Sequence, residues 1–350
     1  MKPYLYLRGL KVAEHTVFAV QDGQKNYYDP TFNKRVSYSS GQQVKRSLLD
    51  MLSETLEENR APVTFNYEIN NKDELGNKEP WSPCDPTYAD QLIGGWMRAR
   101  PGVVTLKRRS PLSISAMRPL HPLLVSMTNE NLTFDRSDRP DNNPIRVINA
   151  AGEALSEEQI NDYLTRKQRT LPRRHWIPDN SRTTGLFVFD VAIDLNRLFS
   201  VSINQHEPEL TADSLQNLRD AGWVASADGE RLIAPAERRT EIIPALASAL
   251  VNWHITSNQA RTYSPQTMLA ITIGDNASRI AGAIRADLDA EQNRDNSYRA
   301  IPVVEPIDGV DLFTSLACKG YVPGVSGSVD ALEQAEQRLI ELLSAYNYEN

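Results

Sequence analysis

Hydrophobic and polar positions form a few clearly periodic segments, and these predict the first elements of the fold. Residues 4–12 alternate after Tyr6 and predict a strand that enters the core. Turn residues at Asp22-Gly23 and Asp29-Pro30 predict a loop or hairpin within residues 13–38. Residues 39–59 predict a helix with Ser39 or Ser40 as N-cap. Apolar residues recur in it at helical spacing, at Val44, Leu48, Leu49, Leu52 and Leu56.

The second half of the chain repeats the order of strand, helix and strand. Residues 185–198 are the most strand-like segment and predict a central strand. Residues 241–255 predict a helix, and 268–276 predict a further strand. This order is expected of an α+β fold built on a ferredoxin-like βαββαβ sheet with long insertions. A closing amphipathic helix is predicted near the end of the chain, with one face formed by Leu332, Ala335, Leu339 and Leu342.

Two polar stretches interrupt this pattern. Residues 59–89 carry Asn70-Asn71 and three prolines from Pro80 to Pro86, and we expect a loop-rich excursion outside the core. A short helix or turn near Gly94-Gly95 and a basic strand from Val103 onward follow it. Residues 129–182 have few apolar positions apart from one helical piece, which predicts an arm or insertion.

Composition changes this picture little. The chain has 350 residues, of which 40% are hydrophobic and 24% charged, so we expect one large or two smaller folded domains. No apolar run approaches the roughly 18–20 residues of a membrane span, and the start lacks the apolar core of a signal peptide. We therefore expect a soluble, cytoplasmic protein with no membrane partner. Cys84 and Cys318 are distant in sequence and are expected to be reduced thiols.

Charge is unevenly distributed along the chain. The formal net charge is −7, but residues 281–350 hold 5 basic and 12 acidic residues, which leaves 33 of each in residues 1–280. No acid occurs from Gln91 to Asn129, where six cations lie. An acidic total therefore does not exclude a polyanionic partner, since binding depends on the local field.

Catalytic motifs are absent from the sequence. It contains no GxxxxGK[ST], GxGxxG or HExxH pattern and no metal-type cluster of Cys or His. Residues 324–328 approach a nucleophile elbow, but a serine replaces its last glycine, and a glycine-rich turn is favoured. We expect a protein that is not an enzyme and that uses no metal or cofactor. A catalytic triad stays open, since its members need not be adjacent in sequence.

The start of the first helix is the strongest candidate site. Lys45 and Arg46 are expected in its first turn, where the helix dipole favours acids rather than cations. An external phosphate would reverse this preference, because free N–H groups, serine hydroxyls and cations would converge on it. The alternative is that both side chains simply point into water. Lys34 and Arg35, just upstream, favour the anion.

Two further basic elements support a polyanionic ligand. Lys107, Arg108 and Arg109 precede a strand with repeated hydroxyls and could contact phosphates. The predicted arm carries cations interleaved with Trp176, a pattern suited to single-stranded nucleic acid. Its basic residues and histidine are Arg166, Lys167, Arg169, Arg173, Arg174 and His175. For each of these elements taken alone, the alternative is a run of charged side chains that simply point into water.

Four segments resemble the backbone subunit of Cascade, the seventh family of CRISPR-associated proteins within the RAMP superfamily. Residues 34–50, KRVSYSSGQQVKRSLLD, look like the strand-to-helix motif of that family. RRSPLSISAM at 108–117 resembles the base of its thumb, and residues 183–198 its central strand. SNQARTYSPQTMLAITIGDN at 257–276 is similar to its late helix-to-strand passage.

This resemblance implies an RRM-like palm with finger and thumb insertions. The corresponding divisions are palm at 1–58, a finger-like insertion at 59–100, palm strand and thumb base at 101–128, a thumb or arm at 129–184, the remainder of the palm at 185–280, and an acidic C-terminal region with the closing helix at 281–350. Copies would assemble head to tail as a helical filament along one guide RNA in a ribonucleoprotein of antiviral defence. The implied partners are crRNA, the target DNA strand, further copies of the chain and other CRISPR effector subunits.

The resemblance also implies individual roles. Guide-RNA phosphates and riboses would be held by Lys34, Arg35, Ser40, Gln42, Gln43, Lys45, Arg46 and Arg261. Met117 would be the apolar residue near the thumb that helps to separate bases. A subunit that accepts any spacer sequence is expected to contact backbone and shape rather than base edges.

Two alternatives to this function stay open. The first is a related RNA-targeting subunit in which a loop aspartate cleaves target RNA, and Asp22 and Asp29 lie in the corresponding loop. The second is a general single-stranded RNA-binding protein with no guide.

Overall fold

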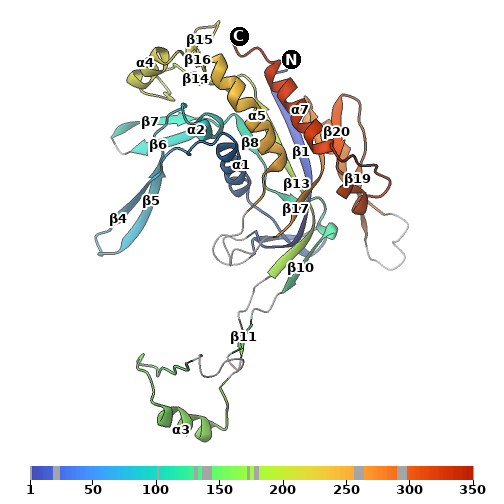
Figure 1. Ribbon diagram of the computed structural model, residues 1–350. Coiled ribbons are helices and arrows are strands. Elements are labelled where there is room, and N and C mark those ends of the chain that lie inside the picture. Colours follow the sequence, from blue (N-terminus) through green and yellow to red (C-terminus); the bar gives the residue numbers. More distant parts are fainter. Residues whose placement is uncertain are drawn as a thin grey trace. The chain divides into compact units, whose positions relative to one another are not determined.

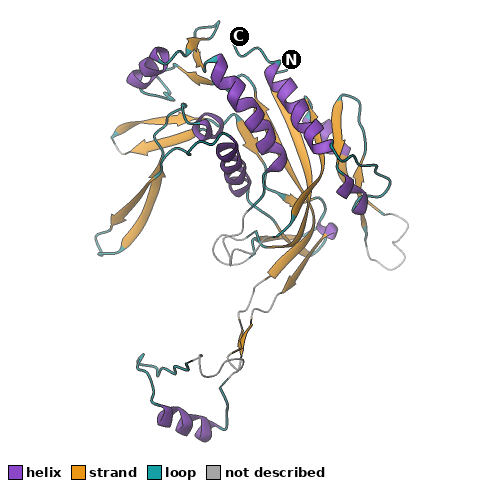
Figure 2. Cartoon of the chain, viewed as in Figure 1, coloured by secondary structure: helices purple, strands orange, loops and turns teal. Residues whose placement is uncertain are grey.

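The computed structural model describes residues 2–18, 24–100, 102–129, 133–135, 144–171, 174–176, 181–255, 264–289 and 298–349. It is an α+β protein with antiparallel sheets, which confirms the α+β part of the predicted fold class (Figures 1 and 2). The chain divides into two compact units. Unit 1 comprises Met1–Met127 and Thr183–Asn350, and unit 2 comprises Thr128–Arg182.

A seven-stranded sheet forms the centre of unit 1. Its strands lie in the order β10-β13-β1-β17-β20, and β8 and β9 also pair with β13. In the register of β1, Leu7 pairs with Val191 on one side and Ile273 on the other, both antiparallel. The sheet contains β1 (Tyr4–Thr16), β8 (Leu112–Ile114), β9 (Arg118–Pro119), β10 (Val125–Asn129), β13 (Ser181–Asp194), β17 (Gln266–Gly274) and β20 (Val310–Thr314).

Each face of this sheet has its own core. Leu5 and Leu7 of β1 pack into a large core with buried residues of three helices, α1 (Gly41–Thr55), α5 (Ala236–Asn252) and α7 (Ala331–Ser344). Leu10 and Val12 belong to a smaller core on the opposite face. That core also contains residues of β18 (Ile284–Leu288), β19 (Ala300–Val304) and the 3₁₀ helix η4 (Leu316–Gly320), and α6 (Ala277–Ala283) directly precedes β18. The alternation of β1 thus sends successive side chains to opposite layers.

Lys11 is an exception within the large core. It is 2% exposed, and its Nζ donates to the Trp253 carbonyl and lies 3.8 Å from the centre of the Trp253 ring. Burial lowers the pKa of Lys11 to about 7.

Besides the antiparallel pair of β18 and β19, three two-stranded hairpins are described in unit 1. They are β2 (Asn26–Asp29) with β3 (Lys34–Ser37), β4 (Thr64–Ile69) with β5 (Leu75–Trp81), and β6 (Trp96–Arg100) with β7 (Val103–Arg108). The expectation of a loop-rich excursion is wrong for residues 64–81. Phe65, Tyr67 and Ile69 alternate with polar residues as in a strand, yet all three are more than half exposed. The segment is therefore a solvent-exposed hairpin held by its own ladder.

Shorter elements complete unit 1. They are α2 (Ala89–Gly94), η1 (Pro122–Leu124), α4 (Ala212–Asp220), and a small sheet of β14 (Ser200–Ser202), β15 (Val224–Ala225) and β16 (Arg231–Ile233). In α7 the predicted apolar face is confirmed in part. Ala335 and Leu339 are buried, whereas Leu332 and Leu342 are partly buried against the core.

Few residues are buried in the described part of unit 2. This part contains one helix, α3 (Glu157–Lys167), and a short pair of strands, β11 (Thr133–Asp135) and β12 (Arg174–Trp176). No residue of α3 is buried. Its ends are instead fixed locally, since Ser156 and Gln159 form a capping box and Gln168 closes the helix in the left-handed conformation. In the described part of the chain, no helix is long and apolar enough to cross a membrane.

Candidate nucleic-acid interface

The N-terminus of α1 is a capped helix end without acids. Ser40 is the N-cap in an extended conformation, and its Oγ accepts a hydrogen bond from the Gln43 amide at 3.4 Å. The first turn, which begins at Gly41, contains no acidic residue. The positive end of the helix dipole is therefore not neutralised by a carboxylate of its own first turn.

Glycine is required at the first helical position by a close approach. A Cβ on Gly41 would lie 2.8 Å from the Ile114 carbonyl oxygen. Just beyond, Ser39 and Met117 exchange backbone hydrogen bonds of 2.9 and 3.0 Å. The segment after β8 thus fixes where α1 begins.

One cation, Lys25, reaches this helix end, and the β2–β3 hairpin that follows it carries two more. Lys25 Nζ lies 3.5 Å from Ser40 Oγ, because the Tyr38 amide pairs with the Lys25 carbonyl and returns the chain beside Ser40. Lys34 donates to the Val125 carbonyl at 2.7 Å, and burial lowers its pKa. Arg35 is exposed and lies opposite Tyr28 in the hairpin register. Lys25 is absent from the sequence-based predictions because only hairpin pairing brings it to Ser40.

We call this group the α1 corner, comprising Lys25, Lys34, Arg35, Ser40 and Gln42. Gln42 is exposed in the first turn of the helix. Among the described residues, no acid forms an ion pair with Lys25, Lys34 or Arg35. The corner combines a helix dipole, a hydroxyl, an amide and three cations, which is the chemistry that holds phosphate.

Lys45 and Arg46 are not in the first turn, which corrects the expected geometry. The helix begins at Gly41, so both lie in its second turn. Lys45 turns inward and donates to the Gly94 carbonyl at the end of α2, at 2.7 Å. Its burial and the nearby Arg108 guanidinium lower its pKa to about 8. Arg46 stays exposed, 3.8 Å from Asp50 one turn further along.

Gln43 and Met117 make contacts inside the protein in this region. The Gln43 Oε1 accepts from the Ser39 hydroxyl at 3.0 Å, and Ser39 itself is buried. Met117 has no exposed surface and belongs to the large core. Because a fully buried side chain contacts only protein, the expected role of Met117 between bases does not fit this structure.

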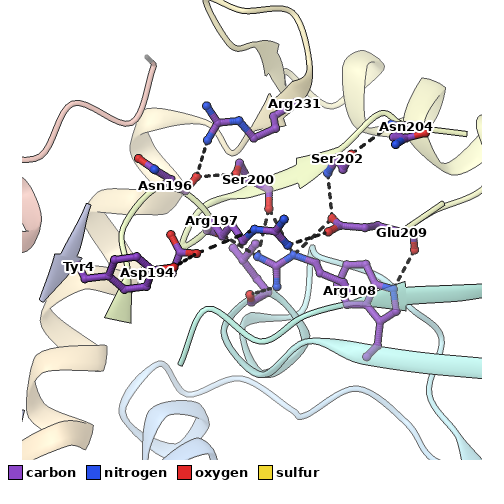
Figure 3. Close-up of polar contacts among 12 residues, drawn as sticks. Tyr4, Arg108, Asp194, Asn196, Arg197, Ser200, Ser202, Asn204, Glu209 and Arg231 are labelled. Carbon is purple, nitrogen blue, oxygen red and sulfur yellow. Dashed lines mark hydrogen bonds and ion pairs between the residues drawn. The ribbon is translucent and has the colours of Figure 1, made fainter. Parts of the chain in front are cut away.

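Arg108 is likewise an interior residue. Its guanidinium donates to the Arg197 carbonyl at 2.7 Å and the Ser200 carbonyl at 3.0 Å, and also to the Leu92 carbonyl (Figure 3). Glu209 lies 3.8 Å away and is itself buried. Burial lowers the pKa of Arg108 to about 10. Arg108 therefore joins β7 to the segment around β14 and is not available to phosphate.

The two neighbours of Arg108, Lys107 on β7 and Arg109 directly after it, face solvent instead. Lys107 and Arg109 are exposed and line a cavity of about 710 Å³. Its other wall is formed by residues 202–209, where the Glu209 carboxylate accepts from the Ser202 amide at 2.8 Å (Figure 3). The alternation of a strand thus divides the predicted basic triplet into one structural and two surface cations.

In unit 2, the predicted cations cluster at the end of α3. Arg166 and Lys167 occupy its last turn, where cations are favoured by the helix dipole. Arg166 also lies 6.0 Å from the centre of the Tyr163 ring. Arg169 lines a shallow pocket of about 480 Å³ with Leu164 and Gln168. The helix dipole and the Tyr163 ring explain why cations are favourable at the end of α3. Because the three side chains are exposed, they could also contact a ligand.

Several residues of the predicted site lie outside the described part of the chain. Arg261, Arg173 and Asp22 lie outside the described residues, and the side chains of Arg174, His175 and Trp176 lie outside the described part as well. Asp29 is described, and its carboxylate accepts from the Phe32 amide at 3.0 Å in the β2–β3 turn. In the described ranges, no group of three or more His, Cys, Asp or Glu residues is arranged to hold a metal ion.

Comparison with known proteins gives distant structural similarities alone. No protein-family model matches the chain, and no curated protein matches it. A solved chain of a "CRISPR RNA-guided surveillance complex" is similar over 97% of this chain and 84% of its own length, with 11% identity and a TM-score of 0.38. A chain of a "CRISPR RNA-guided surveillance complex, pre-nicking" is similar over 97% and 88%, with 10% identity and a TM-score of 0.38. Similarity at this level establishes neither the fold nor the function of the chain.

Proposed function

We propose that this protein binds the sugar–phosphate backbone of single-stranded RNA at the α1 corner. The observation that carries the proposal is a helix N-terminus that has no acid in its first turn and has Lys25 at its N-cap, with two more cations, Lys34 and Arg35, on the hairpin that Lys25 precedes. Backbone contacts of this kind position a strand without reading its sequence. Binding is therefore expected to be independent of sequence and sensitive to salt.

The finer proposal is a non-enzymatic, crRNA-binding backbone subunit of a DNA-targeting CRISPR effector of the Cascade type. The resemblance of residues 34–50 to the motif of that family supports it, since the α1 corner lies largely within this segment. The subunit would assemble head to tail along the guide with further copies and other effector subunits. It would present the guide for pairing with the target DNA strand.

The strand order supports an RRM-like palm in this proposal. β1, β13 and β17 are the first, third and fourth strands of a βαββαβ unit, with β8, β9 and β10 in the position of the second. Their order, with β1 between β13 and β17, is that of a ferredoxin-like sheet. The hairpins β4–β5 and β6–β7 would then be fingers, and unit 2 the thumb.

The test removes two cations of the α1 corner, Lys25 and Arg35, whose side chains donate to no backbone carbonyl among the described residues. Lys25→Ala with Arg35→Ala should weaken binding of single-stranded RNA equally for different sequences. Two lost phosphate contacts should flatten the dependence of log K on log salt by about 1.4 units. Fluorescence anisotropy at several salt concentrations measures both quantities.

A matched control removes the same charge elsewhere on unit 1. Arg219 on α4 and Lys319 on η4 are both exposed, and Arg219→Ala with Lys319→Ala should leave affinity and slope near those of the unmodified chain. Equal behaviour of the two double variants would contradict the proposal. Sequencing of copurified RNA distinguishes the finer proposal from general single-stranded RNA binding. A uniform small RNA indicates a guide, and a mixture of RNAs indicates general binding.

A further inference from the structure

The β2–β3 hairpin presents an aromatic ring beside the α1 corner. Tyr28 is 57% exposed and lies directly opposite Arg35 in the antiparallel register, so both side chains lie on one face of the hairpin. Tyr27, on the other face, packs edge-on against Tyr38 with ring centres 5.7 Å apart. Tyr28 has no such ring partner among the described residues.

Local contacts hold the Tyr28 ring in place. Its hydroxyl donates to the Asn33 side-chain carbonyl across the turn, and Asn33 itself adopts the left-handed conformation that closes the hairpin. The Asp29 carboxylate supports the same turn through the Phe32 amide. A ring fixed at its hydroxyl end has less freedom to lose when a flat group stacks on its face.

The charge around Tyr28 selects the kind of ligand. Asp29 is the only acid between Gln24 and Leu49, whereas Lys25, Lys34 and Arg35 lie on or beside the hairpin. An exposed ring in a positive field suits a polyanion with flat bases better than a neutral apolar partner. Arg35 and Ser40 are five positions apart in the chain, which limits their separation to roughly 16 Å, and a strand of a few nucleotides spans such a distance.

We propose that Tyr28 is a stacking position for one base of single-stranded RNA whose backbone lies on the α1 corner. This inference rests on the proposed function and adds a base contact to it. Arg35 holds a phosphate on the same face of the hairpin, and Tyr28 covers the face of the adjacent base. The contact is tolerant of sequence, because every base has a face on which an aromatic ring can stack.

The experiment compares an intact single-stranded RNA with an abasic strand of the same length. With Tyr28→Ala, affinity for the intact strand should fall roughly fivefold to a hundredfold, the range of one stacked base. Affinity for the abasic strand should not change, and neither should the salt slope, since no charge is removed. Tyr28→Phe should bind the intact strand close to the unmodified chain, because the ring remains.

Tyr67 provides a matched control. It is 61% exposed on the β4–β5 hairpin, where Glu68, Asp73, Glu74 and Glu79 outnumber Lys72 and Lys78. Tyr67→Ala should leave binding of both strands unchanged. Circular dichroism of each variant establishes that the fold is retained.

The outcomes separate this inference from the proposed function. An equal loss on both strands would mean that Tyr28 acts through the shape of the hairpin, which overturns stacking. If Tyr28→Ala binds normally while Lys25→Ala with Arg35→Ala binds weakly, stacking is overturned and the backbone site stands. If neither variant binds weakly, both proposals fall.

Discussion

At the scale of single residues, position in the tertiary structure decides what a cation does. Lys11, Lys45 and Arg108 are withdrawn from solvent to different degrees, and each donates a hydrogen bond to a backbone carbonyl. Removing a cationic group from water costs free energy unless it is paired or hydrogen-bonded, so these three side chains serve the fold. Lys25 and Arg35 have the same chemistry but make no comparable interior contact with the described residues. They are therefore the better candidates for an external anion.

Lys11 gives a testable pH dependence. Its pKa is lowered from 10.5 to about 7, so the folded chain favours the neutral amine while the unfolded chain keeps the ordinary value. Between these two values the unfolded state binds more protons, and the free energy of unfolding should rise with pH by up to about 1.4 kcal/mol per unit. Below pH about 7 this contribution should be flat.

Urea unfolding of the unmodified chain and of Lys11→Met, at pH values from about 7 to about 9, isolates this effect. Other groups that titrate in this range are common to both proteins, so only the difference matters. The unmodified chain should gain stability relative to Lys11→Met as pH rises. Two parallel curves would show that Lys11 keeps its proton in the folded state.

At the scale of elements, α1 joins the candidate site to the core. The buried face of α1 packs in the large core through Val44, Leu48, Leu49 and Leu52. Its first turn, capped by Ser40, carries polar groups instead. The second turn serves packing rather than binding, since Lys45 reaches the end of α2. One helix thus carries a structural and a candidate ligand surface one turn apart.

Lys45 and Arg46 should therefore differ in their effect on stability. Lys45→Ala removes a cation and a hydrogen bond from the C-terminal end of α2 and should lower the free energy of unfolding by about 1–2 kcal/mol. Arg46→Ala, at an exposed position, should change it by no more than about 0.5 kcal/mol. Urea unfolding measures both, and equal values would contradict the assigned role of Lys45.

At the scale of the whole molecule, the two units differ in how they are stabilised. Unit 1 has two cores on the faces of one sheet, formed by its own residues. In unit 2, α3 buries no residue and depends on its caps. The unfolding of unit 1 should accordingly depend little on unit 2.

Replacing residues 130–180 by a short glycine–serine linker tests this independence. The paired strands β10 and β13 bring the two ends of the excised segment together. The shortened chain should unfold within about 1 kcal/mol of the full chain in urea, since no residue of either core is removed. Removing α7, which buries Ala335, Leu339 and Leu343, should by contrast abolish cooperative unfolding. A large loss from the linker replacement would show that unit 2 supports the core.

Periodic apolar patterns were sufficient to predict much of the fold. The predicted strand at 4–12 is confirmed within β1, the helix at 39–59 as α1 and the helix at 241–255 as α5. The strand at 268–276 is confirmed as β17, which ends two residues earlier, at Gly274. Their buried faces are continuous enough for the local period to identify them. The β4–β5 hairpin was missed because its strands bury almost nothing, and polar composition outweighed their alternation.

The candidate site was predictable only in part. Ser40 as N-cap follows from local chemistry, because Ser precedes the apolar helical pattern. Lys25 could not be found, since strand pairing rather than spacing brings it to Ser40. Arg108 and Met117 could not be excluded, because nothing local distinguishes them from their exposed neighbours.

By itself, then, the sequence determined where the periodic elements lie, which helix end lacks acids and how charge divides along the chain. These properties depend on residues close together in the chain, and local sterics and burial preference fix them. Only the tertiary structure decided which cations are interior and which face solvent. That depends on carbonyls and carboxylates more than 15 residues away, such as those of Leu92, Arg197 and Glu209 around Arg108, which folding alone brings together.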